Sequence, residues 1–147
     1  MAGGWQLSSI LRYITGQYVT LDAGDDYART DTDDQRPNQI LASPYAASKS
    51  AAQWLNPAAF AAPALGAYGN MGAGNILGPG SFRLDMGLTR KFQIRENQTL
   101  EFRAEVFNLP NHVNLGNPEI DFSSANFGRI LSASDPRIMQ MAMKFVF

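Results

Sequence analysis

The chain has 147 residues, which is enough for one domain with one modest hydrophobic core. Its net charge of −1 provides neither the basic field expected for nucleic-acid binding nor a polybasic membrane patch. Cysteine is absent, which excludes disulfides, thiol catalysis and cysteine metal sites. No run of about 18 apolar residues predicts a transmembrane helix, and residues 1–5 do not resemble a signal peptide.

The first predicted strand covers residues 4–19. Large side chains recur at every second position near its start, which is the period of a β-strand. The opposite face is mostly polar, with Ile10 as the exception. The residues that carry the apolar face, and that we expect on an edge strand, are Trp5, Leu7, Leu11 and Tyr13.

A long loop is predicted over residues 20–81. Its first part is acidic, and Asp31, Asp33 and Asp34 are candidate calcium ligands. The spacing lacks the glycine and the final glutamate of an EF-hand, so a solvated acidic loop is the favoured interpretation. Residues 48–55 are expected to form a short helix that ends before Asn56-Pro57.

The clearest strand is predicted over residues 82–94. Six of its seven even-numbered residues are apolar, the exception being Arg90, and none of its odd-numbered residues is large and apolar. A helix cannot segregate residues in this way because its period is 3.6. At about 3.3 Å per residue the strand is about 43 Å long, which is enough to cross a bilayer at a tilt.

Two further strands are predicted over residues 99–108 and 136–147. A short polar hairpin, residues 95–98, joins the first of them to the preceding strand. Charged side chains on the polar faces of this hairpin are expected to form ion pairs across the strands. A second loop, 109–135, contains His112, the only histidine, for which we expect neither a metal nor a catalytic role.

Together these elements predict an all-β fold of about four long antiparallel up-and-down strands in a single segment, residues 1–147. Long connections alternate with a short one, as in an outer-membrane β-barrel with long outer loops and short periplasmic turns. No cofactor is predicted, and the chain is not expected to be an enzyme. The predicted membrane-facing or assembly residues are Phe82, Leu84, Met86, Leu88, Phe92, Leu100, Phe102, Val106, Met139, Met141, Met143, Phe145 and Phe147.

A series of short motifs runs along nearly the whole chain. They are Gly4-Trp5-Gln6-Leu7-Ser8, Thr15-Gly16-Gln17, Arg36-Pro37-Asn38, Trp54-Leu55-Asn56-Pro57-Ala58-Ala59-Phe60, Gly78-Pro79-Gly80, Phe102-Arg103-Ala104-Glu105-Val106-Phe107-Asn108, Asn111-His112, Phe127-Gly128-Arg129-Ile130, Pro136-Arg137-Ile138-Met139-Gln140 and Phe147. With these motifs in this order, the sequence resembles the C-terminal end of TonB-dependent outer-membrane receptors, and most closely the Oar-like type with a carboxypeptidase-regulatory-like domain. The resemblance implies a wall segment of a barrel of about 22 strands, from a parent that takes up a large solute such as an iron chelate or a glycan fragment.

Four strands are too few to close a barrel, for which about eight are needed. The sheet is therefore expected to pair its edges either with strands from the missing part of a longer chain or with other copies of itself. The first alternative places the chain in the outer membrane of a Gram-negative-type bacterium, in contact with lipid. The second predicts a self-assembling ring, tube or extracellular filament, and neither alternative involves nucleic acid.

Overall fold

The computed structural model describes residues 4–147, which fall into two compact units. The first unit comprises residues 4–14, 81–114 and 135–147, and the second comprises residues 15–80 and 115–134. The strands that the period of two predicts lie in the first unit. The second unit is built almost entirely from the two predicted loops.

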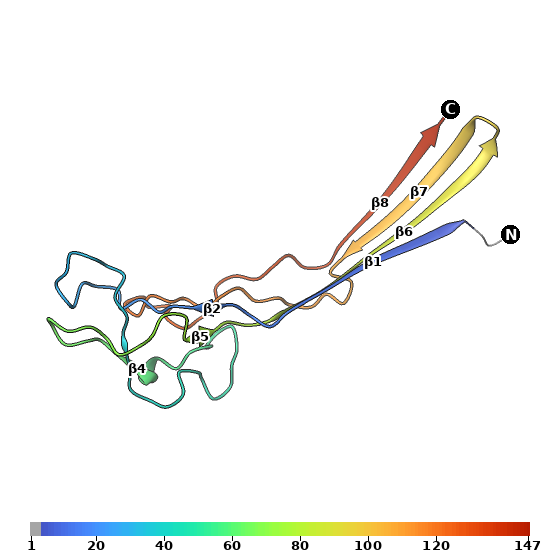
Figure 1. Cartoon of the computed structure of the whole chain (residues 1–147). Helices are drawn as coiled ribbons and strands as arrows, with labels where there is room; N and C mark the ends of the chain where they lie inside the picture. The colour runs from blue at the N-terminus through green and yellow to red at the C-terminus, as the bar shows by residue number, and fades with distance from the viewer. Residues whose placement is uncertain (1–3) are drawn as a thin grey trace. The chain divides into compact units, whose positions relative to one another are not determined.

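The first unit is a four-stranded antiparallel sheet in the order β1-β6-β7-β8 (Figure 1). Its strands are β1 (Trp5–Ile14), β6 (Ser81–Arg95), β7 (Gln98–Phe107) and β8 (Ile138–Val146). Each strand pairs only with its neighbours in the sheet, and the sheet does not close into a barrel. The predicted all-β fold of four up-and-down strands is thus confirmed.

The first strand is shorter than the expected range of 4–19. Gly16 has a φ of +110°, and a Cβ atom at this position would collide with the carbonyl oxygen of Gly78. The chain therefore turns after Ile14, and Tyr18–Val19 form a separate strand, β2, that pairs with β5 (Ile76–Leu77). The turn depends on a glycine because only glycine adopts this conformation without strain.

The hairpin between β6 and β7 is tighter than predicted, with a two-residue turn at Glu96 and Asn97. The register shifts between Gln93 and Arg95, which is the mark of a β-bulge. The side-chain amide of Gln93 donates to the carbonyl oxygens of Arg95 (2.6 Å) and Glu96 (3.1 Å). These bonds fix the turn and hence the register of the whole hairpin.

The second unit has its own hydrophobic core, to which both loops contribute. Short strands β3 (Asn38–Gln39) and β4 (Phe60–Ala61) pair beside the 3-10 turn η1 (Pro57–Ala59). Phe127, from the second loop, packs edge-on against Phe60 and Phe122, with ring centroids 5.3 and 5.1 Å away. The buried core residues are Leu21, Leu55, Ala59, Phe60, Met71, Ile76 and Phe127.

The helix expected over residues 48–55 is not formed. The segment consists of bends, and Ser50 and Gln53 exchange backbone hydrogen bonds across a tight turn. The N–H groups of Trp54 and Leu55 donate to the carbonyl oxygen of Gly128 (2.8 and 3.1 Å) in the other loop. This pairing, together with complete burial of Leu55, replaces the hydrogen bonds that a helix would make.

Asp26 accepts more hydrogen bonds than any other carboxylate of the acidic stretch. It accepts the N–H groups of Thr30 (3.0 Å) and Asp31 (2.8 Å) and the side-chain amide of buried Gln35. The hydrogen bond from the Thr30 N–H is the largest of the contributions that hold the pKa of Asp26 below its ordinary value of 3.8. The ionised carboxylate is therefore the form that this loop stabilises.

Acidification is expected to open the loop around Asp26. Because the pKa of Asp26 is lower in the folded than in the unfolded chain, its stabilisation is complete above pH 3.8 and is lost as the pH falls through the folded-state pKa. Amide hydrogen exchange at Thr30 and Asp31, followed from pH 6 to pH 3 with the intrinsic pH dependence removed, measures this opening. Asp26→Asn should show faster exchange already at pH 6, whereas Asp33→Asn, at an exposed position, should behave like the unmodified chain. Equal exchange in both variants at pH 6 contradicts the role of Asp26.

Candidate functional site

One face of the sheet is apolar across all four strands. The register places Leu7 opposite Leu88, Leu88 opposite Ala104, and Ala104 opposite Met141, so that one row crosses the sheet. The neighbouring rows are also mostly apolar, with Ser9 and Arg90 as the exceptions. The predicted membrane-facing and edge residues that the sheet brings onto this face are Trp5, Leu7, Leu11, Tyr13, Phe82, Leu84, Met86, Leu88, Phe92, Leu100, Phe102, Val106, Met139, Met141, Met143 and Phe145.

Phe147, the last predicted member, follows the end of β8 and is 90% exposed. Its ring lies 6.1 Å from that of Phe145, with the two planes inclined by 31°. The side chains of the two outer strands are also exposed, and Met141 reaches 78%. A continuous apolar face of this extent is unfavourable in water and favours contact with lipid or protein.

Aromatic side chains lie near both ends of the apolar face. Tyr13 is opposite Phe82 at the end of the sheet where the long loops leave the strands, the loop end. Trp5 lies in the same row as Phe102 near the other end, where the turn joins β6 and β7, the hairpin end. The eight residue steps from Trp5 to Tyr13 span about 27 Å along the strand. Tyr18, which could extend an aromatic belt, lies instead in β2 of the second unit.

The opposite face of the sheet, here called the polar face, carries most of the charged side chains, and one of its ion pairs crosses the strands as expected. This pair joins Lys91 on β6 and Glu101 on β7, 3.9 Å apart. Arg103 contacts two carboxylates of its own strand, Glu101 at 3.4 Å and Glu105 at 3.8 Å. Gln140 on β8 donates a hydrogen bond to Glu105. The polar network therefore joins β6, β7 and β8 on one side only.

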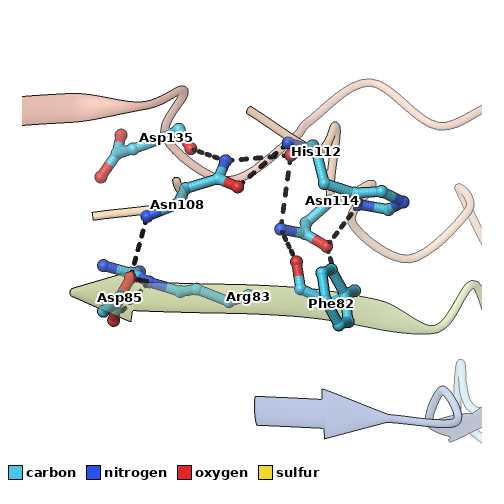
Figure 2. Close-up of polar contacts among 7 residues, drawn as sticks. All are labelled: Phe82, Arg83, Asp85, Asn108, His112, Asn114 and Asp135. Carbon is cyan, nitrogen blue, oxygen red and sulfur yellow. Dashed lines mark hydrogen bonds and ion pairs between the residues drawn. The ribbon is translucent and has the colours of Figure 1, made fainter. Parts of the chain in front are cut away.

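Two buried asparagines, Asn108 and Asn114, connect the strands at the loop end of the sheet through hydrogen bonds (Figure 2). Asn108 is 2% exposed and has a φ of +52°. Its N–H donates to Asp85 (2.8 Å), its Oδ1 accepts from the N–H of His112 (3.0 Å), and its Nδ2 donates to the carbonyl oxygens of His112 (3.0 Å) and Asp135 (3.4 Å). The Oδ1 of Asn114 accepts the N–H of Phe82 (2.7 Å), and its Nδ2 donates to the carbonyl oxygen of Phe82 (3.0 Å). The ends of β6 and β7 and the segment before β8 are tied together in this way.

His112 belongs to this network. Its Nδ1 lies 3.0 Å from Oδ1 of Asn114, and its ring packs edge-on against Phe82, with the centroids 6.0 Å apart (Figure 2). Asn108 and Asn111 belong to the motifs named above, but no structural role was predicted for them or for Asn114. The sequence signal for a turn here is the repeated asparagine after the end of a strand, at Asn108, Asn111 and Asn114. Asparagine tolerates the positive φ that such turns require. Asn111 also has a φ of +54° and accepts the N–H of Arg137 (2.9 Å), which delays the start of β8 to Ile138.

The candidate calcium ligands do not form a site. Asp31, Asp33 and Asp34 are all exposed, and within residues 4–147 no group of three or more His, Cys, Asp or Glu side chains is arranged to hold a metal ion. Asp26, which the sequence analysis did not single out, orders this loop through hydrogen bonds alone. In the same described range, no helix has the length and apolar character needed to cross a membrane.

Comparison with known proteins gives one match. The model of a family described as an outer membrane beta barrel domain matches residues 1–140 of the chain. No curated protein and no solved structure matches the chain at a significant level. The match covers β1, β6 and β7 and both loops, and it ends at Gln140, near the start of β8.

Proposed function

This chain belongs to the outer membrane beta barrel domain family, and from that premise we propose that its sheet is a section of the wall of a TonB-dependent receptor of the Oar-like type. Membership of this family supports an outer-membrane location. The finer assignment rests on the order of the short motifs that resemble such receptors, from Gly4-Trp5 to Pro136-Arg137. In this proposal the parent protein takes up a large solute, and the sheet has a structural role.

The observation that carries the proposal is the apolar face that crosses all four strands, with aromatic residues near both ends. Its rows extend from Tyr13 and Phe82 to Trp5 and Phe102. The lipid-facing band of an outer-membrane barrel is about 25 Å tall and is bounded by aromatic girdles. A strand tilted by about 40° projects its 27 Å onto about 21 Å of bilayer height, which fits within that band.

The polar face supports the same arrangement, because barrel strands alternate between lipid-facing and interior residues. Lys91, Glu101 and Arg103 lie on this face, where an aqueous interior would solvate them. The two-residue turn at Glu96 and Asn97 corresponds to a periplasmic turn, and the second unit corresponds to the outer loops. In this orientation the loop unit is the part that meets the solute.

Trypsin treatment of intact bacteria that carry the protein tests this orientation. Arg29 and Lys49 are exposed in the loop unit, so the peptide of residues 30–49 should be released into the medium and detected by mass spectrometry. Arg95, beside the hairpin turn, should be cleaved only after the outer membrane is permeabilised. Cleavage at Arg95 in intact cells, or a loop that is cut only after permeabilisation, is incompatible with the proposed orientation.

A second candidate function is self-assembly between copies of the chain through the sheet edges. β1 and β8 are the outer strands of the sheet and run in opposite directions, so β8 of one copy can pair antiparallel with β1 of the next. Multi-angle light scattering distinguishes the candidates. A particle containing several copies in detergent micelles favours assembly, whereas one copy per micelle counts against it.

A further inference from the structure

A charged residue, Arg90, lies within the apolar face. The register places it between Trp5 on β1 and Phe102 on β7, with Met143 next in the same row. In the rows from Phe82 to Phe92 on β6, every other residue of this face is apolar or aromatic, except Ser9. Polar side chains return only beyond the bulge, where Arg95 pairs with Gln98 beside the hairpin turn. A guanidinium in this position requires a polar partner, because an isolated charge is costly in an apolar environment.

The sheet itself supplies aromatic rings to Arg90 rather than an acid. Its guanidinium carbon lies 4.5 Å from the ring centroid of Phe92 and 5.0 Å from that of Trp5, both within the range of cation–π contact. The acidic residues of the strands are Asp85, Glu101 and Glu105, and all three lie on the opposite face. The ion pairs of these carboxylates are made with Arg83, Lys91 and Arg103.

The place of Arg90 along the strand indicates what its partner is. It lies near the hairpin end of β6, in a row that contains the indole of Trp5 and the ring of Phe102. Aromatic girdles of this kind sit at the level of lipid headgroups. Arginine is tolerated at that depth because its long side chain reaches the headgroup region. The anions available there are lipid phosphates.

The geometry of the side chain suits a phosphate. Two aromatic rings hold the guanidinium, and its N–H donors form a planar fork that can bind two phosphate oxygens together. We propose that Arg90, held by Trp5 and Phe92, binds the phosphate of an anionic glycerophospholipid in the leaflet on the hairpin side. This inference rests on the proposed function, because it requires the apolar face to contact lipid.

A lipid titration followed by native mass spectrometry tests the proposal. The full chain is folded in nonionic-detergent micelles and titrated with short-chain phosphatidylglycerol, with phosphatidylcholine and inorganic phosphate as comparison ligands. We expect one phosphatidylglycerol to bind ahead of further molecules. Its affinity should fall about tenfold or more in Arg90→Gln, which lacks the charged fork. Arg90→Lys, which keeps the charge but not the planar fork, should give an intermediate affinity and serves if Arg90→Gln does not fold.

Lys91→Gln is the matched control, because Lys91 is the adjacent residue, also positively charged, on the polar face. It should bind phosphatidylglycerol as the unmodified chain does. Wild-type affinity in Arg90→Gln, an equal loss in Lys91→Gln, or displacement of the lipid by inorganic phosphate at equal concentration would each overturn the proposal. These results leave the proposed barrel wall intact, because the exposure of the apolar face to lipid can be measured independently, with spin labels attached at successive positions of β8.

Discussion

Replacing Met141 by arginine is expected to destabilise the sheet in a lipid bilayer by about 2–4 kcal/mol, the cost of a basic residue near the bilayer midplane. Met141 lies near the middle of β8, opposite Ala104, with its side chain directed away from the polar face. In water the same substitution should change the free energy of unfolding by no more than about 0.5 kcal/mol, because the residue is 78% exposed. Urea titrations in lipid vesicles, with tryptophan fluorescence as the signal, measure the difference.

Gln140→Arg provides the control for this substitution. Gln140 is the preceding residue on the same strand, and it faces Glu105 on the polar side of the sheet. Arginine there gains a carboxylate neighbour, so we expect a change within about 0.5 kcal/mol in vesicles. Equal losses for Met141→Arg and Gln140→Arg contradict a lipid-facing role for the apolar face.

The second large effect is expected for Asn108→Ala, which should lower the free energy of unfolding by about 2–4 kcal/mol. The substitution removes the side-chain hydrogen bonds that Asn108 makes to backbone groups of His112 and Asp135, and it leaves those part-buried groups without this partner. It also places an alanine at a φ of +52°, which costs about 1–2 kcal/mol. The same urea titration measures the loss, and we expect hydrogen exchange to rise first at the loop end of the sheet.

Two companion variants separate these contributions. Asn108→Gly accepts the positive φ but makes no side-chain hydrogen bonds, so it should recover about 1 kcal/mol relative to Asn108→Ala. Asn97→Ala, at an exposed position in the hairpin turn, should stay within about 0.5 kcal/mol of the unmodified chain. A loss below about 1 kcal/mol for Asn108→Ala indicates that the asparagine network does not hold the sheet together.

The strands could be predicted because a period of two leaves little ambiguity over ten or more residues. In β6 the alternation of Leu84, Met86 and Leu88 with Asp85 and Gly87 cannot be accommodated by a helix. The same alternation in β7 and β8 also determines which residues share a face. Once the strands pair in antiparallel order, the apolar face follows from the sequence alone.

The ends of the strands could not be predicted from the same pattern. β1 stops at Ile14 because Gly16 approaches Gly78, a residue more than sixty positions away in the chain. β8 begins at Ile138 because the N–H of Arg137 is bonded to Asn111. Both causes are tertiary contacts, which the periodicity of apolar residues along the sequence does not reveal.

The structure of the two loops could be predicted least from the sequence. Residues 48–55 have helical propensity, but Trp54 and Leu55 give their N–H groups to Gly128, and tertiary pairing overrides local preference. The core around Phe60 and Phe127 joins two segments that are separated in the chain by two strands of the sheet, β6 and β7. No short-range sequence pattern predicts such a core, because its residues lie in segments of irregular backbone.

The central claim is that the apolar face of the sheet lies against lipid and the polar face does not. Nitroxide spin labels attached to single cysteines at each position from 138 to 146, in the full chain reconstituted into vesicles, measure this directly. The account predicts that accessibility to dissolved oxygen alternates with a period of two and peaks at Met139, Met141, Met143 and Phe145, while accessibility to a water-soluble nickel reagent does not peak there. Uniformly high accessibility to the nickel reagent along β8, with no alternation, would contradict it.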